Sequence, residues 1–225
     1  MQKYILIGLV SFLAEMTLAQ SYPEPVPELQ VAYFGEFLFH PGAKVGLSLP
    51  FYQWRTEKPQ SSKRKGDYAI VKQKELRLGS NLAFYYLVRN HTGYLLNAEM
   101  TFRRNKFYSF RPEKSSQLEY SFGLGYFRYS LHGTTFTPDG ESFRIINGNG
   151  GAFMPSLALS YGGRLKWKGA HQGRYYIKPM LLAEIPFGTG LQLTTVFEAG
   201  IGIPLSIKGL EVKKGKTKIK TKKKK

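Results

Sequence analysis

A period-two alternation of side chains runs through most of this chain and limits what it can fold into. The clearest stretch is 191–205, LQLTTVFEAGIGIPL, whose odd positions are almost all apolar and whose even positions are mostly small or polar. Successive side chains of a β-strand point to opposite faces. The stretch therefore predicts a long strand with one apolar face and one small or polar face.

Seven further segments repeat this alternation. Short turn sequences typical of hairpins separate several of them, such as HPGA at 40–43, RNHTG at 89–93 and PFGTG at 186–190. Longer connections are expected at 54–74, 104–117 and 131–152. The eight predicted strands lie within residues 29–39, 45–51, 75–88, 93–103, 118–127, 155–167, 173–187 and 191–205.

The polar face of these strands combines small residues with a charged residue near the middle of nearly every strand. In an eight-stranded barrel the interior is just wide enough for side chains to fill it. Acids and bases should then pair across the axis, because an unpaired buried charge is costly. We predict a structural salt-bridge network in the lumen, formed by Glu36, Glu75, Arg77, Glu99, Arg103, Glu119, Arg164, Lys178, Glu184 and Glu198.

The apolar face carries Tyr, Phe and Trp at the strand ends, a pattern typical of a lipid-facing surface bounded by aromatic girdles. A closed ring of strands pairs all its backbone groups and can therefore cross a bilayer. The fold expected for residues 29–207 is all-β, a single antiparallel up-and-down transmembrane β-barrel of eight strands. A soluble lipocalin-like carrier of an apolar ligand remains the alternative, because a soluble barrel can show the same alternation with its apolar face turned inward.

The N-terminal segment has the features of an export signal. Lys3 precedes an apolar stretch from Tyr4 to Ala14, and Thr17-Leu18-Ala19 suits a cleavage site after Ala19. The apolar stretch is shorter than the roughly 18 to 20 residues that span a bilayer. We predict a signal peptide at 1–19, a Pro-rich lead-in at 20–28 and localisation in the outer membrane; a chain with no cysteine has neither disulfides nor a lipoprotein anchor.

The chain has a formal net charge of +18, and residues 213–225, KKGKTKIKTKKKK, contribute nine lysines to it. Behind an export signal, nucleic acid is not an expected partner. We predict that residues 208–225 form a disordered arm at the membrane surface, meeting outer-membrane lipids, lipopolysaccharide or an acidic envelope protein; a solvated solubility tail is the alternative. The predicted anionic-surface contacts are Lys63, Arg64, Lys65, Lys213, Lys214, Lys216, Lys218 and Lys220.

Residues for catalysis are sparse. The Phe-x-His-x-Ser pattern of lipid A deacylases is absent, and all four histidines lie in predicted turns or loops beside Gly or Pro. The only aspartates, Asp67 and Asp139, lie in predicted loops. We predict no catalytic residue, metal site or cofactor, and an enzymatic role is less expected than a structural or interaction role. A membrane-embedded enzyme acting on lipid A or phospholipid is kept as the alternative.

Several segments together resemble a known family. HPGAKVGLSLPFYQW, RNHTGYLLNAEMTFRR, FGLGYFRYSLHGTTF, and FMPSLALSYGGRL followed by IKPMLLAEIPF are similar to an uncharacterised family of small outer-membrane β-barrel proteins of Bacteroidota. The resemblance covers most of the mature chain and implies the barrel fold without indicating an activity. One conflict follows: with both termini in the periplasm, the predicted long loops would mostly lie inside and the short turns outside, the reverse of the usual pattern.

Overall fold

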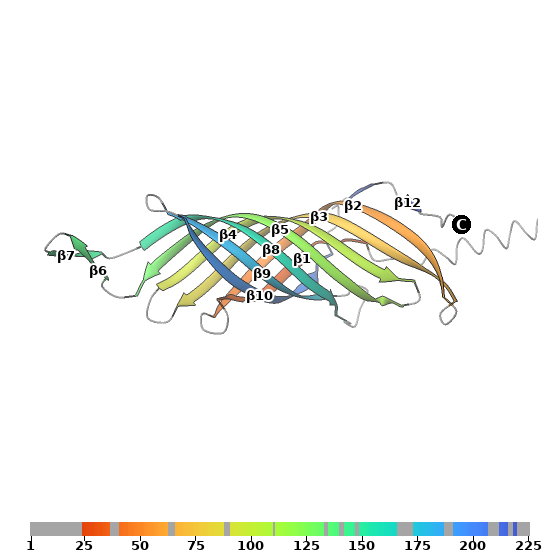
Figure 1. Ribbon diagram of the computed structural model, residues 1–225, viewed down its shortest axis with the longest axis horizontal. Coiled ribbons are helices and arrows are strands. Elements are labelled where there is room, and N and C mark those ends of the chain that lie inside the picture. Colours follow the sequence, from red (N-terminus) through yellow and green to blue (C-terminus); the bar gives the residue numbers. More distant parts are fainter. Residues whose placement is uncertain are drawn as a thin grey trace, which may run out of the picture.

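Eight long strands form a closed antiparallel ring in the computed structural model of this chain (Figure 1). Each pairs with the next of these eight strands along the chain, β5 with β8 across the intervening β6–β7 hairpin, and β1 closes the ring by pairing with both β2 and β10. The predicted all-β, antiparallel up-and-down barrel of eight strands is therefore confirmed. Its strands are β1 (Glu28–Gly35), β2 (Gly42–Ser62), β3 (Gly66–Leu87), β4 (His91–Tyr108), β5 (Arg111–Leu131), β8 (Asn149–Arg164), β9 (Arg174–Pro186) and β10 (Gln192–Pro204).

The structure describes most of residues 24–219. The predicted signal peptide, 1–19, lies outside the described residues. In the described part of the chain, no helix is long and apolar enough to cross a bilayer. The described ranges are 24–36, 41–62, 66–87, 91–109, 111–132, 135–139, 142–146, 149–165, 173–186, 191–206, 212–215 and 218–219.

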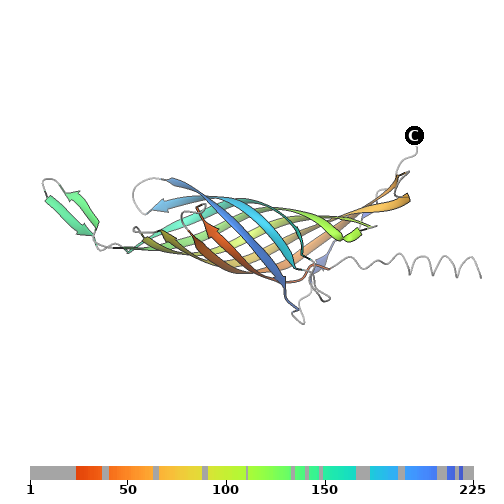
Figure 2. The same cartoon turned by 90° about the horizontal axis from the view of Figure 1, so that it is seen from below.

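Four short strands lie outside the ring. β6 (Thr135–Asp139) and β7 (Ser142–Ile146) form a hairpin between β5 and β8. β11 (Lys213–Lys214) and β12 (Lys218–Ile219) pair with β2 in parallel. The β6–β7 hairpin lies beyond one end of the barrel, which we call the far end, whereas β1 begins and β10 ends toward the opposite, termini end (Figures 1 and 2).

The predicted long connections at 54–74 and 104–117 are wrong, because both continue as paired strands. β2 and β3 stay in register from Gly42↔Tyr85 to Ser62↔Gly66, apart from one bulge, and β4 pairs with β5 as far as Tyr108↔Arg111. β1 accompanies β2 only to Ser48. Beyond the ring, residues 54–62, 66–74, 104–108 and 111–115 therefore form a projecting sheet at the termini end (Figure 2).

This correction removes the conflict over loop lengths. Only residues 63–65 separate β2 from β3, and only residues 109–110 separate β4 from β5, at the termini end. The long connection with its β6–β7 hairpin lies at the far end. Short turns on the side of the termini and a long loop on the opposite side are the usual arrangement of outer-membrane barrels.

The ring is polar inside and apolar outside. On β5, Ser121 and Gly123 face inward and are buried, whereas Phe122 and Leu124 face outward and are 45% and 47% exposed. A side chain at Gly123 would clash, because its Cβ would lie 2.4 Å from Ser156 Oγ. All eight strands expose large apolar side chains, among them Val31, Val45, Leu78, Leu96, Phe122, Leu157, Ile177 and Leu193.

Candidate functional site

The inward-facing side chains change character along the barrel axis, as β9 shows. From the termini end to the far end its inward positions are Arg174, Tyr176, Lys178, Met180, Leu182 and Glu184. The lumen therefore has three layers: a cluster of arginines and carboxylates, a cluster of lysines and carboxylates, and an apolar layer that ends in an acidic mouth.

The arginine cluster pairs three guanidinium groups with three carboxylates. Arg103 donates from Nη1 and Nη2 to the two oxygens of Glu28, at 2.5 and 2.8 Å, and from Nε to Glu119. Arg174 Nε lies 2.7 Å from Glu28 Oε2. Arg77 Nη1 lies 2.9 Å from a Glu75 oxygen. The formal charges of these six buried side chains cancel.

The lysine cluster pairs two ammonium groups with two carboxylates. Lys178 Nζ lies 2.6 and 2.7 Å from the two oxygens of Glu99. Lys44 Nζ lies 2.7 Å from Glu198 Oε2, and the Tyr176 hydroxyl donates to Glu198 Oε1 at 2.6 Å. The Arg174 guanidinium lies 4.4 Å from the centroid of the Tyr176 ring, which links the two clusters. The formal charges cancel here as well.

The structure brings together seven of the ten side chains predicted for the lumen network: Glu75, Arg77, Glu99, Arg103, Glu119, Lys178 and Glu198. Three others lie elsewhere. Glu36 and Glu184 lie at the mouth of the far end, and the Arg164 guanidinium lies over the Phe107 ring, 4.6 Å from its centroid.

Three members of the clusters were missed from the sequence: Glu28, Lys44 and Arg174. Glu28 was placed in the lead-in, although β1 begins there and Glu28 is in phase with the inward Gln30. Lys44 is likewise in phase with the inward Ser48, and Arg174 with Lys178. Glu28 and Lys44 lie just outside the predicted strands 29–39 and 45–51, so extending those strands by one residue would have included them. Arg174 lies within the predicted strand 173–187, so the alternation alone could have identified it.

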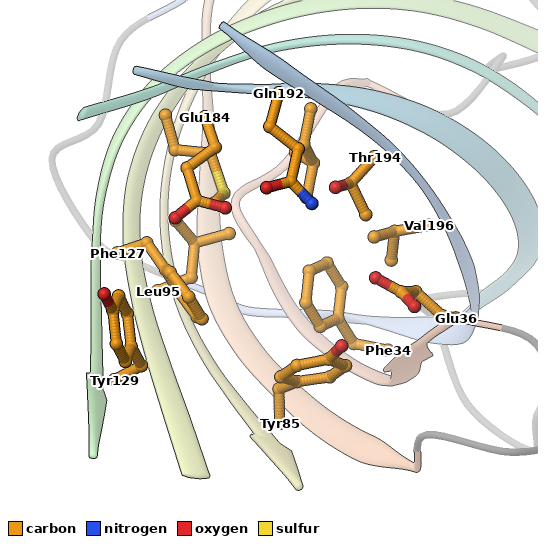
Figure 3. A pocket seen from close by; sticks show the side chains of 12 residues that line it. Phe34, Glu36, Tyr85, Leu95, Phe127, Tyr129, Glu184, Gln192, Thr194 and Val196 are labelled. Carbon is orange, nitrogen blue, oxygen red and sulfur yellow. The ribbon is translucent and has the colours of Figure 1, made fainter. Parts of the chain in front are cut away.

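A cup opens at the far end of the lumen, with a volume of about 380 Å³ (Figure 3). Its wall and floor are apolar or aromatic, and Glu36, Glu184, Gln192 and Thr194 bring polar groups to it. Six of the lining residues, Phe34 among them, belong to the buried apolar cluster that separates the cup from the lysine cluster. We call this site the mouth cup; its other described lining residues are Tyr85, Leu95, Phe127, Tyr129, Met154, Leu182 and Val196.

The outer face of the projecting sheet carries a second feature, which we call the basic collar. It consists of Lys58, Lys72, Lys74, Arg104 and Lys106, which share one face by the strand register. Two aromatic rings lie beside the basic collar, because Lys74 Nζ is 5.8 Å from the ring centroid of Trp54 and 5.9 Å from that of Phe102. Partial desolvation and the charges of four neighbouring cations lower the pKa of Lys72. These cations therefore lie close enough to repel one another.

The C-terminal tail lies along an edge of the same sheet. Lys213–Lys214 pairs with Tyr52 and Gln53, Lys218–Ile219 pairs with Thr56 and Glu57, and Gly215 N donates to Gln53 O at 2.7 Å. Residues 213–215 and 218–219 therefore differ from the disordered arm predicted for 208–225, whereas residues 208–211, 216–217 and 220–225 of that arm lie outside the described residues. The physical reason is that β1 begins opposite Ser48. Beyond Ser48 the edge of β2 has no pairing with β1, and the tail residues pair with that edge instead.

The paired tail residues run beside β2 toward Ser62, at the end where the β2–β3 turn lies. Among the predicted surface contacts, Lys213 is exposed, and the backbones of Lys214 and Lys218 are in the paired segments. Lys63, Arg64, Lys65, Lys216 and Lys220 lie outside the described residues.

Groups that could support an enzymatic role are few in the part of the chain that the structure describes. No group of three or more His, Cys, Asp or Glu side chains there could hold a metal ion. Thr92 Oγ1 lies 2.6 Å from His132 Nε2, but this pair lies at the far end beside the ring of Tyr86 and is exposed. No protein-family model, curated protein or solved structure matches the chain, so its function must be argued from its own residues.

Proposed function

We propose that this protein is an integral β-barrel of a bacterial outer membrane, with a sealed lumen and a structural or interaction role. The observation that carries the proposal is the inverted distribution of its side chains. Ten charged side chains are buried in ion pairs within the ring, each at most 9% exposed, while large apolar side chains are exposed on every strand of it. Soluble monomers rarely expose apolar patches larger than a few hundred Å².

The outward residues also have the length and order expected for a membrane-spanning strand. On β4 the outward positions from Tyr94 to Phe102 are Tyr, Leu, Ala, Met and Phe, and the exposed Arg104 follows. These nine residues match the roughly 9 to 11 that a tilted strand needs to cross the hydrocarbon core. Aromatic residues at both ends of such a run suit the two membrane interfaces.

The lumen supports a sealed barrel rather than a porin or a soluble carrier. The two charge-balanced clusters occupy the lumen between the termini end and the apolar layer, where an ion would have to separate buried ion pairs in order to pass. A lipocalin-like carrier needs an apolar interior at that position and a polar outer surface. The observed faces are the reverse.

The basic collar gives this barrel its interaction surface. It lies just beyond the apolar band at the termini end, beside Tyr52, Trp54 and Phe102, where the headgroups of the bilayer would be. The predicted export signal and an even number of strands favour a periplasmic location for this end. The collar and the tail would then meet the phosphates of the inner, phospholipid leaflet, and the mouth cup would open to the outside.

Extraction and conductance together test this proposal. The mature protein, refolded into phosphatidylcholine vesicles, should resist extraction at alkaline pH, require detergent for purification and give no steady ion current across a planar bilayer. A stable monomer in buffer without detergent would contradict the membrane assignment. A steady current would contradict the sealed lumen but not the membrane assignment.

A further inference from the structure

We propose that the mouth cup binds an organic cation that carries an apolar group, of the arylalkylamine class. The cup lies at the far end of the barrel, opposite the basic collar, and is separate from the membrane-facing surface. Its described lining residues combine two carboxylates, four aromatic rings and an apolar floor (Figure 3). Each of these features restricts the chemistry of the occupant.

The negative charge of the lining residues favours a cation as the occupant of the cup. Glu36 and Glu184 bring carboxylates to it from β1 and β9, and none of its twelve described lining residues is basic. The lumen below is different, because there each cluster contains as many cations as carboxylates; Glu99, for example, holds Lys178 at 2.6 Å. The cup is therefore acidic, whereas the two ion-pair clusters below it are charge-balanced.

The aromatic and apolar walls of the cup favour binding of an organic cation over a hydrated inorganic cation. Tyr85 and Phe127 lie edge to face with ring centroids 6.4 Å apart, and Phe127 and Tyr129 lie 6.0 Å apart. Aromatic faces attract ammonium and guanidinium groups, most strongly where water is excluded. The buried Leu95, Met154 and Leu182 add an apolar floor that a hydrated metal ion would leave unused.

The size of the cup limits the occupant to a small molecule or a single protruding side chain. Its volume of about 380 Å³ is near the lower end of the roughly 300 to 1,000 Å³ of small-molecule pockets. Figure 3 shows the carboxylates of Glu36 and Glu184 directed into the open space between the strands. Because the ion-pair clusters fill the lumen below, the cup is closed at its base and serves recognition rather than transport.

A matched series of three ligands tests the inference on the folded protein in a non-ionic detergent, by isothermal titration calorimetry. The probes are 2-phenylethylammonium, the neutral 2-phenylethanol and the anionic 3-phenylpropanoate, which share the phenyl group and differ in charge. We expect the ammonium compound to bind at least about tenfold more tightly than the alcohol, and the anion to show no binding. Equal affinities for the first two, or no detectable binding of the ammonium compound, would overturn the proposal.

Two variants test whether the mouth cup is the binding site of the ammonium compound. Glu36→Gln combined with Glu184→Gln should weaken binding of the ammonium compound by about tenfold or more and leave the alcohol unaffected. Glu57→Gln, on the projecting sheet at the opposite end, is the matched control and should change neither affinity. If the double variant binds like the wild type, the cup is not the site. Because all measurements use detergent-solubilised protein, their outcome is independent of whether the barrel resides in an outer membrane.

Discussion

Replacing Arg103 by Met is expected to lower the free energy of unfolding by about 3 to 5 kcal/mol, the usual cost of removing one partner from a buried ion pair. Arg103 is 3% exposed and contacts both Glu28 and Glu119. Its loss leaves the arginine cluster with one carboxylate in excess, because only Arg77 and Arg174 then remain for Glu28, Glu75 and Glu119. Urea unfolding in vesicles, followed by the mobility shift between folded and unfolded barrel, measures the change.

The neighbouring Arg104 provides the control for this experiment. It is the next residue of β4, but it faces outward and is exposed, so Arg104→Met should cost less than about 1 kcal/mol. Adding Glu119→Gln to Arg103→Met should restore part of the stability, because it restores the charge balance of the cluster. Equal losses for Arg103→Met and Arg104→Met would show that the lumen network does not hold the barrel together.

Replacing three lysines of the basic collar by Gln is expected to remove up to about 3 kcal/mol of stabilisation by anionic lipid. Lys72, Lys74 and Lys106 face outward beside the aromatic residues of the termini end. A basic residue near an anionic bilayer surface contributes about 1 kcal/mol. The measurement is the difference in unfolding free energy between phosphatidylcholine vesicles with and without phosphatidylglycerol, for the wild type and the triple variant.

Two controls separate the collar from other sources of charge. Arg128→Gln changes an exposed cation of β5 nearer the far end and should reduce the effect of phosphatidylglycerol by about 1 kcal/mol or less. Deleting residues 213–225 removes the nine tail lysines and leaves the collar intact; if assembly and membrane level are then unchanged, the tail is a solvated extension. A triple variant that keeps the full effect of phosphatidylglycerol at low salt would contradict the role of the collar, since salt screens exposed charges.

The alternation of side chains predicted the ring but not the projecting sheet. Within the ring one face is apolar and the other polar, so period two is visible in segments such as 118–127 and 191–205. In the projecting sheet both faces are largely polar, as Gln73 and Lys74 show on successive positions of β3. A bulge between Pro50 and Tyr52 also shifts the register of β2, which interrupts the pattern at the point where the sheet leaves the ring.

The mouth cup could not be predicted in the same way. Alternation gives the face on which a side chain lies, but not its depth along the barrel axis. Phe34, Leu95 and Val196 meet because β1, β4 and β10 have particular registers around the ring, and no local sequence signal sets those registers. For the same reason Glu36 and Glu184 were assigned to the ion-pair network, although they lie on the inward side of the barrel beyond its apolar layer.

The exposure of the outer face to lipid is the central claim, and nitroxide accessibility tests it most directly. The chain contains no cysteine, so single labels can be placed by Leu157→Cys, which faces outward, and Ser156→Cys, which faces the lumen. In vesicles, the label at position 157 should collide freely with oxygen and rarely with a water-soluble nickel chelate, while the label at 156 should be shielded from both. If the nickel chelate reaches position 157 as readily as it reaches a label in water, the outer face is not in a membrane and the account is wrong.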